Sequence, residues 1–154
     1  MNIQYLIKMQ NTPKIGHFEN NGISESEIEQ LEIKMGVKFP KAYKEFLYLG
    51  GEYESILQSW NRGFENLEFM QEDAQKTIQE VGLTLRPFWC FAEYDSADSF
   101  LFFFLDEGDN PAVYNFLSIE YFEDENGDTI HYKQTHNTFS DCIDGKIDYA
   151  LNNP

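Results

Sequence analysis

The chain has few of the residues that point to secretion, disulfide bonding or membrane insertion. It contains only two cysteines, Cys90 and Cys142, which stand in no CxxC or Cys/His pattern, so we expect buried thiols in a reducing compartment. The longest purely apolar run, residues 100–105, is far too short to span a bilayer. Residues 1–10 do not have the pattern of a signal peptide. A cytoplasmic protein is therefore expected.

Basic residues are also scarce. Eleven lysines and arginines stand against 27 aspartates and glutamates, which gives a net charge of −16. A field of this sign repels nucleic acid phosphates and anionic membranes, and it attracts basic partners. Solubility alone is the alternative explanation of such a charge. We expect no direct binding to nucleic acid or to a membrane.

No catalytic or cofactor-binding motif stands out. The chain has no GxGxxG, GxxxxGK[ST], HExxH or GxSxG pattern. His131 and His136 have neither helical spacing nor a nearby cysteine, which argues against a metal site. The acidic run 123–128 lacks the alternating ligands and the closing glutamate of a calcium loop. We expect no catalytic residue, cofactor or metal, and a pocket holding strongly perturbed carboxylates would argue otherwise.

What the chain does contain is enough apolar surface for one core. It has 154 residues, of which 42% are apolar and 16% are aromatic. A domain of this length buries about 70% of its unfolded surface. There is no internal repeat and no linker long enough to divide the chain. Residues 1–154 are therefore expected to form a single domain with its core over about 22–150.

The clearest local signals lie in residues 23–51. Ser24 and Glu27 form a capping box at the start of a helix that ends at Gly36. Pro40 at the first helical position starts a second helix, which two glycines end. The periodicity places Tyr43, Phe46 and Leu47 inside, and it places three charged side chains in water, namely Lys41, Lys44 and Glu45.

The remaining pattern predicts an α+β fold. A third helix is expected over 67–81 and a last helix over 138–151. Strands are expected over 88–93, 99–105 and 112–117, with a hairpin of 120–122 and 129–132 that turns at Asn126-Gly127. Residues 1–22 should form an arm with one short strand or turn, and residues 52–65 should be anchored by Trp60 and Phe64. Helices followed by an antiparallel or mixed sheet and a final helix indicate helices packed on that sheet.

Charge is distributed unevenly along the chain. Between Arg86 and Lys133 there is no lysine or arginine but there are eleven acids, most of them at strand ends and in turns. We expect them to gather along one side or edge of the sheet, either as protection against aggregation or as a docking surface for a cationic partner. The expected contact residues combine eight of these acids with three tyrosine anchors: Tyr53, Glu93, Tyr94, Asp95, Asp98, Asp106, Glu107, Asp109, Tyr121, Glu123 and Asp124.

The order and spacing of several short motifs are also informative. The first group is Ile28, Leu31, Glu32, Gly36, Phe39-Pro40, Tyr43, Phe46-Leu47 and Gly50-Gly51. The later group is Phe91-Ala92, Asp98, residues 100–105, Gly108, Val113 and Thr138-Phe139-Ser140. Together these motifs resemble the SUKH superfamily, in its Smi/Knr branch, over about residues 22–150.

The resemblance implies an α+β domain that acts by binding another protein. For bacterial members it implies immunity: they neutralise a cognate toxin domain, commonly a nuclease, of a contact-dependent or polymorphic toxin system. An acidic inhibitor suits a basic nuclease because it covers the surface that binds phosphates. We expect such a toxin as the partner of a monomer or weak homodimer. A regulatory or scaffold module without a toxin partner is the alternative.

Overall fold

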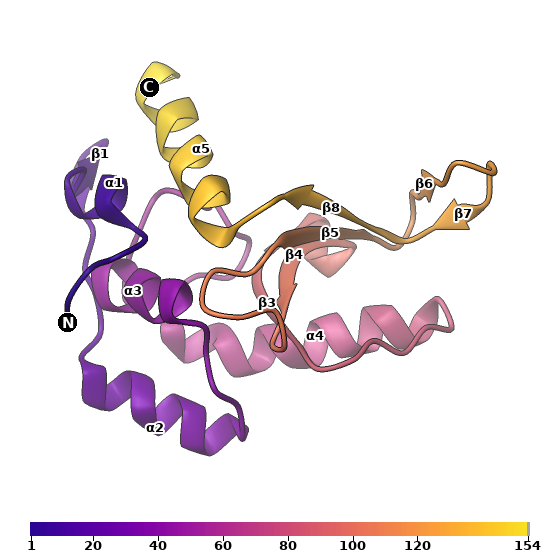
Figure 1. Cartoon of the computed structure of the whole chain (residues 1–154), viewed down its shortest axis with the longest axis horizontal. Coiled ribbons are helices and arrows are strands. Elements are labelled where there is room, and N and C mark those ends of the chain that lie inside the picture. Colours follow the sequence, from indigo (N-terminus) through magenta and orange to yellow (C-terminus); the bar gives the residue numbers. More distant parts are fainter. Residues whose placement is uncertain (154) are drawn as a thin grey trace.

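A four-stranded antiparallel sheet with the strand order β3-β4-β5-β8 lies at the centre of the molecule (Figure 1). The computed structural model describes residues 1–153. The strands of the sheet are β3 (Phe88–Tyr94), β4 (Ser99–Phe104), β5 (Val113–Leu117) and β8 (Tyr132–His136). The first three agree with the expected strands to within one residue at each end.

The sequence pattern does not predict β8. Its five residues are mostly polar and exposed, so they lack the apolar alternation by which a strand is recognised. They pair with β5, for instance Phe116 with Tyr132, although residues 118–131 separate the two strands in the sequence. A register shift between Val113 and Tyr114 further masks the pairing. The strand exists because a non-local partner satisfies its backbone.

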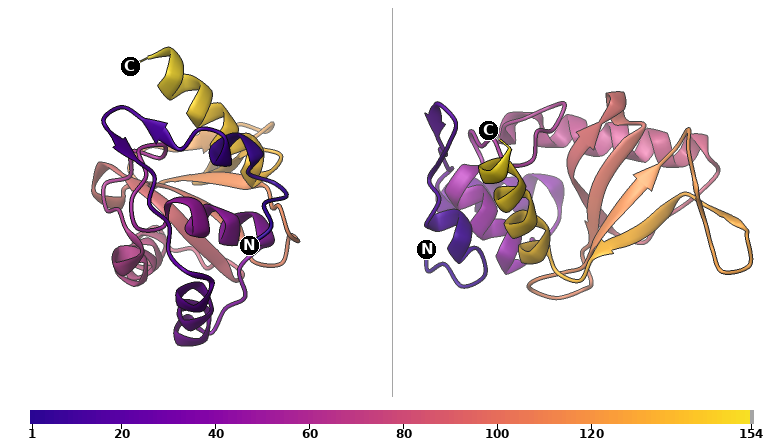
Figure 2. Two further views of the ribbon diagram at one scale, coloured as in Figure 1. Left: turned by 90° about the vertical axis from the view of Figure 1, so that its left-hand side faces the viewer. Right: turned by 90° about the horizontal axis from the view of Figure 1, so that it is seen from above.

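Helices pack against this sheet from more than one side (Figures 1 and 2). The helix α4 (Leu67–Glu80), which follows a short 3-10 turn η1 (Phe64–Asn66), runs along β3. The helices α3 (Lys41–Gly50) and α5 (Phe139–Asn152) contact each other, and α2 (Glu25–Met35) contacts α3. The α+β expectation is confirmed.

The ring of Tyr43 joins these layers at the centre of the core. It lies 5.3 Å from the ring of Phe103 in β4 and 5.8 Å from that of Phe139 in α5, both edge to face. Its hydroxyl oxygen accepts a hydrogen bond of 3.0 Å from the indole N–H of Trp89 in β3. Edge-to-face pairs of this kind are favourable beyond the area that they bury. One residue of α3 thus contacts two strands and the last helix.

The helix ends agree with the local signals almost completely. The hydroxyl of Ser24 accepts the N–H of Glu27, and the carboxylate of Glu27 accepts the N–H of Ser24, so the capping box is confirmed. Gly36 ends α2 in the left-handed region at φ 66°. Pro40 is displaced by one position: its ψ of 147° is extended, so it is the cap of α3, and the helix begins at Lys41.

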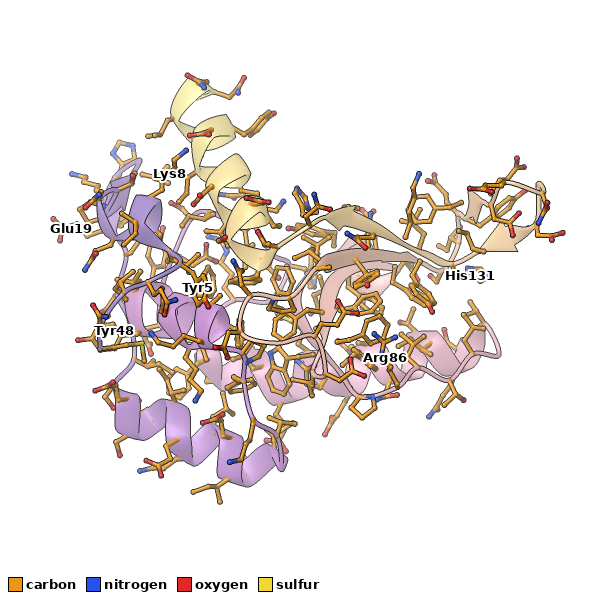
Figure 3. The ribbon with its side chains drawn as sticks, viewed as in Figure 1. Tyr5, Lys8, Glu19, Tyr48, Arg86 and His131 are labelled. Carbon is orange, nitrogen blue, oxygen red and sulfur yellow. The ribbon has the colours of Figure 1, made fainter. Side chains whose placement is uncertain are left out.

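The N-terminal segment is more ordered than expected. It contains a one-turn helix, α1 (Ile7–Gln10), and a small hairpin of β1 (Lys14–Ile15) and β2 (Phe18–Glu19). Its apolar side chains join the core, and Leu6 is fully buried. The helix α1 contacts α5, where Lys8 pairs with Asp148 at 2.9 Å (Figure 3 labels Lys8). The expectation of one strand or turn was therefore too simple.

Glu45 does not face water, contrary to the periodicity argument. It is fully buried, and its Oε1 accepts hydrogen bonds from three consecutive backbone N–H groups, those of Gln4, Tyr5 and Leu6, at 3.1, 2.8 and 3.0 Å. Its Oε2 lies 2.9 Å from the ammonium of Lys41, one helical turn earlier. The spacing of charges on the helix is as expected, but the N-terminal segment folds back over this face.

Trp60 is not a core anchor, because its side chain is 68% exposed. Its segment runs along the free edge of β3, where the N–H of Trp60 donates to the carbonyl of Glu93 at 2.7 Å. Farther along this edge the amide of Gln71 both donates to and accepts from the backbone of Cys90. These contacts cover an edge strand that would otherwise be open to pairing. Phe64 is half-buried against the core, as expected.

The Glu45→Gln substitution should lower the free energy of unfolding at pH 7 by about 2 kcal/mol, because it removes a buried charge surrounded by donors. Burial by itself raises the pKa of Glu45, but the N–H groups and Lys41 outweigh it, and the pKa lies below its ordinary 4.5. The stabilisation is therefore complete above pH 4.5 and is lost as the pH falls through the folded-state value. Urea unfolding should show that the difference in the free energy of unfolding between Glu45→Gln and the unaltered protein becomes smaller at acidic pH.

The control is Glu29→Gln, which neutralises an exposed glutamate on α2. It should change stability by less than about 0.5 kcal/mol. A Glu45→Gln variant as stable as the unaltered protein at pH 7 would show that the N-terminal segment does not depend on this carboxylate.

Candidate partner-binding surface

The acids expected along one edge of the sheet lie at two opposite ends of it. Tyr94 pairs with Ser99 at one end of the β3–β4 ladder, and Phe88 pairs with Phe104 at the other. Successive turns of an antiparallel sheet alternate between its ends, so residues 93–98 and residues 106–109 are separated by the length of the strands. The expectation of a single acidic edge is wrong for this reason.

Two of the three acids at the 106–109 end share one cation. Arg86 lies 2.9 Å from Asp106 and 2.6 Å from Glu107, and its guanidinium stacks over the ring of Phe104 (Arg86 is labelled in Figure 3). Asp109 is exposed, but its carbonyl accepts the N–H of Ala42 and so ties this loop to α3. This end of the sheet therefore offers less free negative charge than its sequence suggests.

The other end carries a projecting hairpin, which we call the acidic arm (residues 118–131). It contains β6 (Phe122–Glu123) and β7 (Thr129–Ile130) and extends away from the helices (Figures 1 and 2). At its base the N–H of Leu117 donates to the carbonyl of His131 at 2.7 Å (Figure 3 labels His131). The arm has five exposed acids, Glu120, Glu123, Asp124, Glu125 and Asp128. None of them forms an ion pair within residues 1–153.

The turn of the arm is built by its own residues. The carboxylate of Asp124 accepts the N–H groups of Asn126 and Asp128 at 2.8 and 2.9 Å. Gly127 has φ 78°, in the left-handed region that glycine favours. The predicted Asn126-Gly127 turn is confirmed, although each strand beside it has only two residues. Asp124 therefore shapes the arm as well as charging it.

Two large apolar side chains stand among these acids. Ile119 is 77% exposed and Tyr121 is 55% exposed. Exposed apolar residues surrounded by charge are typical of protein-binding surfaces. Tyr121 was among the expected contact residues, whereas Ile119, Glu120, Glu125 and Asp128 were not. Their signal is present in the sequence as apolar residues alternating with acids in a segment without cations.

The β3–β4 turn extends the acidic surface to the base of the arm. Asp95, Ser96 and Ala97, which form η2, have φ values of 52°, 56° and 71°. Three consecutive non-glycine residues in this region are strained. They are held in part by Thr77 of α4, whose hydroxyl donates to the carbonyl of Ala97 at 3.2 Å. The N–H of Ser118 donates to the carbonyl of Asp98, which brings this turn and the arm together.

Glu93 is not part of this exposed surface, because only 1% of it is accessible. A bulge between Cys90 and Ala92 changes the alternation of β3, and Glu93 then pairs with Phe100 and points inward. Asn61 donates to its Oε1, but its Oε2 has no partner within residues 1–153. Burial raises the pKa of Glu93, and Asp73 raises it further. The expectation of Glu93 as a contact residue is corrected accordingly.

The two remaining tyrosines lie elsewhere. Tyr53 and Tyr94 line a groove beside α5. The hydroxyl of Tyr94 donates to the carbonyl of Leu57 at 2.6 Å, which holds the ring against the loop before α4. The eleven expected residues therefore divide among the arm with its neighbouring turn, the Arg86 end of the sheet, the core and this groove.

The chain is thus an α+β domain with an acidic hairpin that projects from its sheet, and within residues 1–153 no group of side chains is arranged to hold a metal ion. No helix among these residues is long and apolar enough to cross a membrane. Residues 22–145 match the model of the SMI1/KNR4 family (SUKH-1), so the chain belongs to this family. No match was found among the curated proteins. The matched residues include the arm and leave out α1, β1, β2 and the end of α5.

The Glu93→Gln substitution should raise the free energy of unfolding at pH 7 by about 1 kcal/mol, because the amide keeps an acceptor for Asn61 and carries no buried charge. Because the pKa of Glu93 is raised, its ionisation destabilises the folded state at pH values above the ordinary pKa of 4.5. The difference in the free energy of unfolding between Glu93→Gln and the unaltered protein should shrink as the pH falls, because Glu93 then becomes protonated in both the folded and the unfolded state. Urea unfolding across this range measures it.

The comparison variant is Glu93→Ala, which also removes the acceptor for Asn61 and leaves a cavity. It should be less stable than the unaltered protein at every pH. If Glu93→Gln is also destabilising at pH 7, the buried carboxylate is compensated by its surroundings, and our account of it fails.

Proposed function

We propose that this chain is an immunity protein that binds and neutralises a cognate toxin domain of a contact-dependent or polymorphic toxin system. Family membership supports the proposal, since bacterial members of the SUKH superfamily act in this way. We further propose that the toxin domain is a basic nuclease and that neutralisation takes place in the cytoplasm by stoichiometric binding, without catalysis or a cofactor.

The observation that carries the proposal is the uncompensated charge of the arm and its neighbouring turn. This surface has seven acids, Asp95, Asp98, Glu120, Glu123, Asp124, Glu125 and Asp128. They lie in a stretch, residues 87–132, that contains no lysine or arginine. None of these acids is within ion-pair distance of a cation in residues 1–153. Their field therefore extends into solvent, where it accelerates the encounter with a cationic surface.

Apolar anchors give the surface more than long-range attraction. Charges at the rim of an interface chiefly affect association, whereas buried aromatic and aliphatic side chains account for most of the affinity. Ile119 and Tyr121 project from the arm next to Glu120. A partner that covers them removes their apolar surface from water and brings its cations close to the surrounding carboxylates.

The shape of the arm suits the inhibition of a nuclease. A nuclease binds phosphates in a cationic cleft, and a narrow hairpin with carboxylates on both sides of its turn presents negative charge to such a cleft. The base of the arm is fixed by the pairing of Leu117 with His131 and by the contact of Ser118 with Asp98. The arm can therefore bind without first paying the full cost of ordering.

The test is capture of partners on the tagged protein at low salt, followed by elution with rising salt and a nuclease assay of the eluted polypeptide. We expect one basic polypeptide in a one-to-one complex, with its nuclease activity lost when the chain is added back. The triple variant Glu120→Gln, Glu123→Gln and Glu125→Gln should bind at least about tenfold more weakly at low salt, because each lost pair contributes to a favourable coupling. Asp124 is left unchanged because it shapes the turn.

The matched control removes three other exposed glutamates, Glu29, Glu52 and Glu65, which have no ion-pair partner within residues 1–153. It changes the net charge equally but should alter affinity by less than about twofold. If both triple variants weaken binding of the partner equally, only the net charge of the chain matters. A captured partner that is neither basic nor inhibited would exclude the nuclease proposal, and the absence of any stoichiometric partner would favour the scaffold alternative.

A further inference from the structure

A groove of about 1290 Å³ lies between the β1–β2 hairpin, the loop that contains residues 53–58 and the helix α5. Figure 1 shows β1 and α5 together at the left, on the opposite side of the molecule from the arm. Most of two walls of this groove comes from residues 14–18 and 146–153, which lie outside the residues matched by the family. The groove therefore has to be argued from the structure of this chain and not from its family.

Among residues 1–153, no aspartate or glutamate lines the groove. Acids make up 27 of the 154 residues, yet none of the 20 residues that line the groove is an aspartate or a glutamate. Its charged side chains are three cations, Lys14, Arg62 and Lys146, accompanied by His17 and His136. None of the three cations forms an ion pair within residues 1–153. The buried carboxylate of Glu54 accepts the N–H groups of Ile56 and Leu57, and burial raises its pKa although Arg62 and Lys146 act to lower it.

The walls between these cations are apolar and exposed. Phe18 and Tyr149 are 68% and 70% exposed, and Phe18 lies edge to face with Tyr53 at 6.1 Å. The ammonium of Lys146 is 5.9 Å from the centre of the Tyr94 ring. The lining thus contains both cations and aromatic rings, which combines sites for negative charge with surface that gains by leaving water.

We propose that this groove binds an acidic peptide segment of a partner protein, with its carboxylates at Lys14, Arg62 and Lys146 and an apolar side chain against Phe18 and Tyr149. Charge complementarity favours an acidic occupant, because the charged side chains of the groove are cations although the molecule as a whole has a net charge of −16. Three cations among 20 lining residues are too few for the basic track that a nucleic acid backbone needs, and the overall charge repels a long polyanion.

The groove and the arm serve partners of opposite charge. The arm presents acids without an ion pair, whereas the groove presents cations without an ion pair, and no residue of the arm lines the groove. Binding at the groove therefore does not rest on the proposed toxin interaction. A variant of one surface should leave the other unaffected, so the failure of either proposal can be recognised separately.

The experiment measures fluorescence anisotropy of a labelled peptide in which glutamates alternate with leucine and tyrosine. The unaltered chain should bind it with a submillimolar Kd and should bind the matched glutamine peptide at least about tenfold more weakly, since the groove selects charge. The variant Lys14→Glu, Arg62→Glu and Lys146→Glu should lose at least about tenfold in affinity. The neutral variant with glutamine at the same three positions should lose less, and it serves if the charge-reversed variant fails to fold.

The matched control is Lys38→Glu, Lys76→Glu and Lys133→Glu, which reverses three exposed cations outside the groove that have no ion pair within residues 1–153. It should change peptide affinity by less than about twofold. Equal losses in both triples, equal binding of the glutamine peptide, tighter binding of a single-stranded DNA, or no binding at millimolar peptide would each overturn the proposal. Self-association of the chain that the groove triple abolishes would assign the groove to a second copy instead.

Discussion

The carboxylate of Glu45 is the contact on which one whole side of this molecule depends. It accepts three consecutive N–H groups of residues 4–6 and pairs with Lys41, so it fixes the N-terminal segment on α3. With that segment in place, α1 packs on α5 and the β1–β2 hairpin becomes a wall of the cationic groove. A buried charge of this kind is stabilising only when its donors are complete, and here they come from parts of the chain about 40 residues apart.

The rest of the architecture follows from apolar burial around Tyr43. Its ring contacts both α5 and β4, and its hydroxyl accepts from Trp89 of β3, so the helical layer and the sheet share one core. The sheet in turn decides where charge is placed. Its antiparallel turns alternate between two ends, and this places the compensated acids near Arg86 and the free acids on the arm. The register therefore decides which acids lie near Arg86 and which lie on the arm.

Much of the fold could be predicted from local patterns, and most of the errors have one physical cause. The capping box of Ser24, the left-handed Gly36 and the Asn126-Gly127 turn depend on near neighbours, and each was found. Glu45, Glu93 and β8 depend on segments far away in the sequence, and each was missed or misplaced. The acid-rich stretch was visible, but its division between two ends required the register. The groove could not be anticipated, because its cations Lys14, Arg62 and Lys146 meet only after folding.

The central claim is that the acidic arm is the surface by which this family member recognises a basic protein. Hydrogen–deuterium exchange on the chain, free and in complex with its captured basic partner, tests it most directly. The account predicts slower exchange in residues 118–131 and 95–98 on binding, with residues 14–18 and 146–153 of the groove unchanged. Slower exchange confined to other elements, with the arm exchanging as fast as in the free chain, would contradict the account.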